Sequence, residues 1–230
     1  MKKTVIVTGA SGNLGKAVIK KFLSENYYVA GTVIPGDPVP VDITDEHFEK
    51  IVVDLADENA AEKFVQDVIS KQGIIDAAVL TVGGFAMGKF IETGLEEIHK
   101  QFKLNFDTAY NTARPVFVQM IKQGSGRIFM IGSRPGLEAG SGKGMAAYSL
   151  AKSLIFRLAE LMNNESKGKN VVTSVIVPST IDTPQNRASM PDSDFEKWVK
   201  PEAIAEVIYF YCTPAAAVIR DPVIKVYNNS

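Results

Sequence analysis

The chain has one cysteine, two histidines and no long apolar run. A single cysteine, Cys212, in 230 residues excludes an internal disulfide framework, and His47 and His99 are too few for a metal site built from histidine and cysteine. No stretch approaches the roughly 18 consecutive apolar residues that span a bilayer. The apolar run after Met1 is broken at Gly9, too early for a secretory signal. We therefore expect a cytoplasmic protein with no bound metal and no membrane partner.

The chain also lacks an excess of charge of either sign. Lysine and arginine number 25 and the acids 26, a net charge of −1, so nothing predicts a nucleic-acid partner. Hydrophobic residues make up 46% and charged residues 22%, which excludes disordered and fibrous classes. An α/β chain of this length can bury one substantial core. We expect residues 1–230 to form a single dinucleotide-binding domain.

Short apolar runs alternate with helical patterns throughout the chain. The runs are continuous rather than alternating, which is typical of a parallel sheet covered on both faces. The sequence therefore predicts an α/β fold, a Rossmann-type doubly wound parallel sheet of about seven strands with helices on both faces. The predicted strands are 4–8, 27–34, 51–55, 75–82, 127–131, 171–177 and 223–227, and the predicted helices are 14–24, 57–72, 95–122 with a kink at Pro115, 146–166 and 201–212.

A glycine-rich segment, Thr-Gly-Ala-Ser-Gly-Asn-Leu-Gly at residues 8–15, joins the first strand to the first helix. Glycine permits a tight turn and lets a diphosphate approach the backbone, while the helix N-terminus offers N–H groups and a partial positive charge. The strand before it and the helix after it favour dinucleotide binding over an ordinary tight turn. The predicted contacts are Gly9, Ser11, Gly12, Asn13, Leu14 and Gly15.

The residues after the second strand do not select between NAD and NADP. An acid there would bond the ribose 2′-OH of NAD, but Val33 and Ile34 occupy the position. Asp37, 22 residues after Gly15, could make this contact, although its proline-rich loop favours an exposed turn residue. No arginine follows the strand to hold a 2′-phosphate. The expected cofactor is NAD or NADP, with no preference assigned.

Tyr148 and Lys152 lie four positions apart, which places them on one face of a helix. An ordinary tyrosine pKa of about 10 is too high for easy proton exchange near neutral pH. A nearby ammonium lowers that pKa, so the tyrosine can give a proton to a carbonyl oxygen as hydride arrives, or take one from an alcohol. The alternative is an ordinary helix-surface pair; the nucleotide-binding turn favours catalysis.

Two further polar residues are candidates for the same site. Ser133 directly follows the predicted strand 127–131 at the sheet edge where ligands bind, and its hydroxyl could hold the substrate oxygen beside Tyr148; the alternative is a cap or turn residue. Asn105 lies among apolar neighbours in the predicted helix 95–122. If buried, its amide needs a partner, and it could hold a water in a proton relay to Lys152; the alternative is a satisfied core amide.

Together these motifs resemble the short-chain dehydrogenase/reductase family, in order and over essentially the whole chain. The resemblance implies a nicotinamide cofactor and the catalytic set Asn105, Ser133, Tyr148 and Lys152. It implies that Asp54 contacts adenine, that Lys152 also holds the nicotinamide ribose and that Thr183 holds the nicotinamide amide. The remaining implied cofactor contacts are Leu55, Val82, Gly83, Tyr148, Pro178, Ser179 and Thr180.

Two segments, residues 178–195 and Val82-Gly83-Gly84-Phe85, resemble the quinonoid dihydropteridine reductases within that family. Those enzymes lack the serine and asparagine that this chain has. The chain also departs from the family pattern: Asn13 replaces a small residue, and Ser133 precedes Tyr148 by 15 residues, two more than usual, which predicts a longer loop at 140–144. The proline-rich stretch 35–45 leaves little room for the usual second helix.

We therefore expect an NAD(P)(H)-dependent oxidoreductase that transfers hydride between nicotinamide and a small carbonyl, alcohol or pterin-like substrate, with Tyr148 as proton donor or acceptor. The alternative is a non-catalytic dinucleotide-binding sensor, which needs none of the catalytic set. A nucleotide-sugar epimerase fits the glycine spacing, but 230 residues leave little for its substrate domain.

Residues 184–200 are the expected substrate loop or lid, with a plain surface loop as the alternative. The helices 95–122 and 146–166 are apolar on more than one face, and the resemblance implies that they form a homodimer or homotetramer interface.

Overall fold

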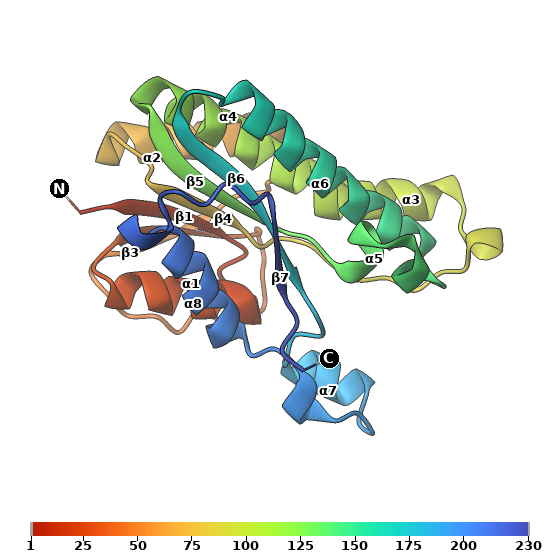
Figure 1. Cartoon of the computed structure of the whole chain (residues 1–230). Helices are drawn as coiled ribbons and strands as arrows, with labels where there is room; N and C mark the ends of the chain where they lie inside the picture. Colours follow the sequence, from red (N-terminus) through yellow and green to blue (C-terminus); the bar gives the residue numbers. More distant parts are fainter. Residues whose placement is uncertain (1, 230) are drawn as a thin grey trace.

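The computed structural model describes residues 2–229, which form one seven-stranded sheet between two layers of helices (Figure 1). Every neighbouring pair of strands is parallel, in the order β3-β2-β1-β4-β5-β6-β7. This confirms the predicted doubly wound sheet, whose strand order reverses between β1 and β4. The strands are β1 (Thr4–Thr8), β2 (Tyr28–Val33), β3 (Phe48–Val52), β4 (Ala77–Leu80), β5 (Ser125–Ile131), β6 (Asn170–Pro178) and β7 (Val223–Val226).

Helices α1 (Asn13–Ser24) and α8 (Pro201–Tyr211) pack together on one face of the sheet, and α2 (Glu58–Gln72), α4 (Thr108–Gln123) and α6 (Ala146–Glu165) cover the other (Figure 1). Their apolar stripes explain this packing: Phe22 of α1 and Val116 of α4 are fully buried in the two cores on either side of the sheet. Each large side chain buried in this way contributes about 1.5–3 kcal/mol.

The connection from β2 to β3 contains no helix within residues 34–47, as its prolines predict. The third strand spans Phe48–Val52 rather than the predicted 51–55. It is an edge strand, and its charged Glu49 and Lys50 interrupt the apolar run that defined the other strands. Phe48 packs on Gly31 of β2, where an added Cβ would lie 2.6 Å from the ring.

The predicted single helix over 95–122 is wrong in one respect. It is divided into α3 (Leu95–Phe102), a π-helical turn η2 (Lys103–Asp107) and α4, while Pro115 lies inside α4 without ending it. A π turn inserts an extra residue, and such turns often occur at functional sites. Two short helices follow strands, α5 (Arg134–Leu137) after β5 and α7 (Pro184–Ser189) after β6. Within residues 2–229, no helix has the length and apolarity needed to cross a bilayer.

Candidate active site

A cleft of about 730 Å³ opens beyond the carboxyl ends of β1, β2 and β4, where the strand order reverses. Lys100 of α3, Lys103 and Leu104 of η2 and Thr108 of α4 line one side. Ile181, Thr183 and Asn186 line another. Most of the predicted cofactor residues line it: Gly9, Ser11, Gly12, Asn13, Leu14, Gly15, Asp54, Leu55, Val82, Gly83 and Thr183.

The glycine-rich turn brings the start of α1 against the end of β1. Gly9 has φ +70°, which only glycine adopts without strain, and a Cβ on Gly15 would lie 2.1 Å from the carbonyl oxygen of Gly9. Gly12 is the N-cap residue that precedes α1, and no side chain caps this end of the helix. The first N–H groups of α1 therefore remain available to a diphosphate, so this turn fits the dinucleotide that the sequence predicts.

Asp37 lies in the turn after β2 and also lines the cleft; its contact with the ribose stays a prediction. Its carboxylate accepts hydrogen bonds from the Ser11 hydroxyl and from the backbone N–H of Val39, and it lines the cleft. The Ser11 hydrogen bond is the main reason that the pKa of Asp37 lies below its ordinary value. Spacing from the glycine turn identifies Asp37 as a candidate, but only the fold brings it to Ser11.

Lys152 is a buried side chain next to the cleft residue Gly83. Its side chain comes from α6, is 5% exposed, and donates a 2.8 Å hydrogen bond from Nζ to the carbonyl oxygen of Ile131 at the end of β5. Burial lowers the pKa of Lys152 to about 8. A Cβ on Gly83 would lie 3.1 Å from Nζ and 2.7 Å from Asn105 Oδ1. The cleft residue Gly83 thus lies against two of the predicted catalytic side chains, Lys152 and Asn105.

The side chains of Ser133 and Tyr148 are hydrogen-bonded to each other. Ser133 caps α5, where its Oγ accepts a 3.2 Å hydrogen bond from the N–H of Gly136, and its side chain also bonds Tyr148. Burial raises the pKa of Tyr148, and the Ser133 bond lowers it only in part. Burial has the larger effect, so the pKa of Tyr148 lies above its ordinary value. The phenol therefore keeps its proton at neutral pH.

Asn105 is 1% exposed at the π turn, and its side chain is already hydrogen-bonded within the protein. Its Nδ2 donates to the carbonyl oxygen of Gly84 at 3.0 Å and to the side chain of Gln101 at 2.9 Å, while its Oδ1 accepts from the N–H of Gly84 at 3.1 Å. These bonds satisfy the amide within the protein, and the water-holding role of Asn105 stays a prediction. The side chain fixes the loop after β4 against η2.

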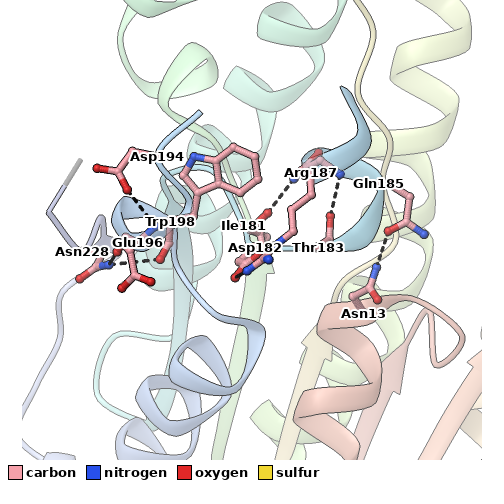
Figure 2. A network of polar contacts seen from close by, with 11 residues as sticks. Asn13, Ile181, Asp182, Thr183, Gln185, Arg187, Asp194, Glu196, Trp198 and Asn228 are labelled. Carbon is pink, nitrogen blue, oxygen red and sulfur yellow. Dashed lines mark hydrogen bonds and ion pairs between the residues drawn. The ribbon is translucent and has the colours of Figure 1, made fainter. Parts of the chain in front are cut away.

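The segment after β6 closes one side of the cleft. Asn13 Nδ2 at the start of α1 donates a 2.9 Å hydrogen bond to Gln185 Oε1 on α7, and Figure 2 shows these two side chains meeting. The Thr183 hydroxyl caps α7, and Arg187 makes a bidentate ion pair with Asp182 (Figure 2). Residues 184–200 therefore fold into α7 and the turn at Phe195–Lys197.

Five predicted cofactor residues do not line the cleft: Tyr148 and Lys152, described above, and the segment Pro178, Ser179 and Thr180. Pro178 ends β6. Ser179 donates from its hydroxyl to the carbonyl oxygen of Tyr227, and the carbonyl oxygen of Thr180 accepts from the N–H of Val199. Among residues 2–229, no group of three or more histidine, cysteine or acidic residues could hold a metal ion.

The family model of the short chain dehydrogenases matches residues 3–194. A cyclic-di-GMP-binding biofilm dispersal mediator protein of Escherichia coli (strain K12) is 28% identical over 225 residues, covering 94% of this chain and 92% of that one. The dihydropteridine reductase of Dictyostelium discoideum is 26% identical over 216 residues, covering 93% and 89%. The structure of ElxO with NADP bound shares the fold, with a TM-score of 0.89, 22% identity and coverage of 98% and 97%. The chain belongs to the short chain dehydrogenase family and is a short-chain oxidoreductase.

Proposed function

We propose that the protein reduces a small carbonyl or pterin-like compound with NADH or NADPH, and that Tyr148 donates the proton. The observation that carries this proposal is the hydrogen bond between Ser133 and Tyr148, on the helix that also places the buried Lys152 next to the cleft residue Gly83. The reduced nicotinamide, when bound, supplies the hydride. A protonated phenol beside the nicotinamide site can give its proton to the carbonyl oxygen of the substrate and so complete the reduction.

The protonation states of the side chains favour the reducing direction. Burial keeps the pKa of Tyr148 above its ordinary value, so its proton is in place before reaction. The Ser133 hydroxyl accepts from Gly136 and can turn its own proton toward a substrate oxygen. The Lys152 ammonium, in a water-poor environment, stabilises the negative charge that the phenol acquires when it gives up its proton.

The rim beside Tyr148 is apolar and suits a flat or aromatic substrate. The Phe85 ring meets the Tyr148 ring edge-on, with centroids 5.2 Å apart, and Phe85 and Met87 are 62% and 69% exposed. Backbone hydrogen bonds between Gly88 and Gly144 and between Ala146 and Gly88 hold this segment against the start of α6. An exposed aromatic next to the proton donor supports a pterin-like or aryl carbonyl substrate.

We also propose that two copies associate through α4 and α6. Tyr110 and Val118 on α4, and Leu150 and Leu161 on α6, are exposed apolar side chains on the layer that covers one face of the sheet. Leu150→Glu should convert the oligomer to monomers in sedimentation, and a wild-type monomer at micromolar concentration would contradict the proposal.

The cytoplasmic location stays a prediction.

The deciding experiment is titration with NADH and NADPH, followed by turnover of ketones, aldehydes and a quinonoid dihydropterin. Tyr148→Phe should bind the cofactor with unchanged affinity and lose about 10²–10⁴-fold in turnover, because only the proton donor is removed. Tyr211→Phe on α8 is the matched control and should keep full turnover. Undiminished turnover by Tyr148→Phe would refute the role of Tyr148. Cofactor binding without turnover of any of these compounds would favour the sensor alternative.

A further inference from the structure

Two lysine side chains, Lys100 and Lys103, line the cleft from the layer of helices opposite the glycine-rich turn. Lys100 lies in α3, and Lys103 is the first residue of η2. Both elements pack against α6, whereas the turn leads into α1 on the other face of the sheet (Figure 1). A diphosphate bound at the start of α1 would therefore lie between the glycine-rich turn and the two lysines.

Contacts of the neighbouring residues hold the backbone that carries the two lysines. Asn105 is hydrogen-bonded to Gly84 and to the Gln101 side chain, and an added Cβ on Gly84 would lie 2.6 Å from Leu104. Residues 101, 104 and 105 are thus fixed to the loop after β4, either directly or through Asn105. The lysines beside them in the chain are therefore held at the edge of the cleft.

Within residues 2–229, no hydrogen bond or ion pair involves the ammonium group of Lys100 or of Lys103. Each lysine has an acid four positions away, Glu96 before Lys100 and Asp107 after Lys103. Ion pairs commonly form at this spacing on a helix, yet neither pair is present here. An anion that enters the cleft therefore meets two positive charges without displacing an ion pair.

The same cleft contains two carboxylates, Asp37 and Asp54, which would repel an anionic cofactor. Asp37 accepts a hydrogen bond from Ser11, and Asp54 accepts one from the backbone N–H of Ala56 at 2.9 Å. The chain as a whole has a net charge of −1, so no general positive charge attracts a diphosphate. The two lysines supply the positive charges that balance these carboxylates within the cleft.

We propose that Lys100 and Lys103 attract the diphosphate of the dinucleotide into the cleft and hold it against the glycine-rich turn. This inference rests on the dinucleotide binding in the proposed function and does not depend on turnover. The N–H groups at the start of α1 meet one side of the diphosphate, and the two ammonium groups neutralise its other side. NADH and NADPH share this diphosphate, so both cofactors should depend equally on the two lysines.

The kinetic test is the association rate of NADH and of NADPH, measured by stopped-flow fluorescence. Lys100→Gln and Lys103→Gln should each slow association about twofold to fivefold at low salt, and the double variant about tenfold. The difference from the wild type should disappear in about 0.5 M sodium chloride, because salt screens exposed charges. Lys122→Gln removes the same charge from the last turn of α4, outside the cleft lining, and should leave the rate unchanged.

Two kinetic results would overturn the proposal. An unchanged association rate in the double variant would show that the lysines do not attract the cofactor. Slower association of NADPH alone would place the lysines at the 2′-phosphate instead of the diphosphate.

A binding test with ADP and adenosine separates this proposal from the proposed reductase activity. In calorimetry the double variant should bind ADP about tenfold more weakly than the wild type and bind adenosine, which has no phosphate, equally well. An equal loss for both ligands would mean that the cleft itself is damaged, and would overturn the proposal. If ADP binding falls as expected but no carbonyl compound is reduced, the role of the lysines stands and the proposed activity fails. Failure of the wild type to bind ADP or NADH would overturn both.

Discussion

The Ser11 hydroxyl donates a 2.5 Å hydrogen bond to the Asp37 carboxylate, and this bond joins the glycine-rich turn after β1 to the loop after β2. Both residues line the cleft, and the lowered pKa of Asp37 keeps its carboxylate charged at neutral pH. A carboxylate beside the glycine-rich turn is suited to accept the ribose 2′-OH of NAD and to repel the 2′-phosphate of NADP.

We therefore predict that the wild type binds NADH more tightly than NADPH. Asp37→Ser should weaken NADH binding by about 1.5–3 kcal/mol, the typical contribution of a hydrogen bond to a charged group, and should narrow the difference between the cofactors. Fluorescence titration of both cofactors measures this. Asp42→Ser, an exposed acid in the same loop, should change neither affinity. Tighter binding of NADPH to the wild type would show that Asp37 does not face the ribose.

Gly83→Ala should impair catalysis without unfolding the protein. The added methyl group would lie 2.7 Å from Asn105 Oδ1 and 3.1 Å from Lys152 Nζ, so these side chains must shift. We expect a loss of about tenfold to a hundredfold in kcat, since small displacements of catalytic groups have effects of this size. Gly140→Ala, where an added Cβ meets no heavy atom within 4 Å, is the control and should keep full activity. Wild-type kcat in Gly83→Ala would mean that the position of Lys152 does not limit turnover.

Activity should fall as the pH rises through about 8, where Lys152 loses its proton. If the ammonium is required, kcat/KM for the cofactor, which reports the free enzyme, should drop about tenfold per pH unit above that value. A profile of reduction that stays flat between pH 7 and pH 10 would show that the charge of Lys152 is not needed.

The same group makes a prediction about stability. Burial favours neutral Lys152 in the folded state, while the unfolded chain keeps the ordinary pKa of 10.5. Between these two values the unfolded state binds more protons, so Lys152 should make the free energy of unfolding of the cofactor-free protein rise with pH. Lys152→Met should flatten this rise in urea titrations from pH 8 to pH 10. An identical slope in the variant would place the pKa of the buried lysine near its ordinary value.

Cofactor binding should protect residues 184–200 from proteolysis if this segment acts as a lid. Trypsin can cut after the exposed Arg187 and Lys197, and NADH should slow both cleavages. Gln185→Ala removes the bond to Asn13, worth about 0.5–1.5 kcal/mol, so the protection should fall about twofold to tenfold. Gln66→Ala, an exposed glutamine on α2, should leave the protection intact. Equal cleavage rates with and without cofactor would favour a plain surface loop.

Local pattern predicted the fold well because strands and helices leave short-range signatures. The apolar runs predicted the parallel sheet, and the helical pattern at 57–72 matches α2, which Asp57 caps. The prediction of helices and strands was poorest where the surroundings of the residues change along a single strand or helix. The edge strand β3 is half polar, and the π turn around Asn105 depends on hydrogen bonds to Gly84, which lies far from Asn105 in the chain.

The sequence by itself determined the order of the elements, the glycine-rich turn and the presence of Tyr148 and Lys152 on one helix, because each depends on residues a few positions apart. Only the tertiary structure decided that Asp37 meets Ser11 and that Arg134 stacks on Tyr227, since each contact joins loops at the ends of different strands. The tertiary structure also decided the protonation states of Tyr148 and Lys152. Burial, which depends on every element packed around a group, sets the pKa of Tyr148 and of Lys152 more strongly than their spacing on the helix.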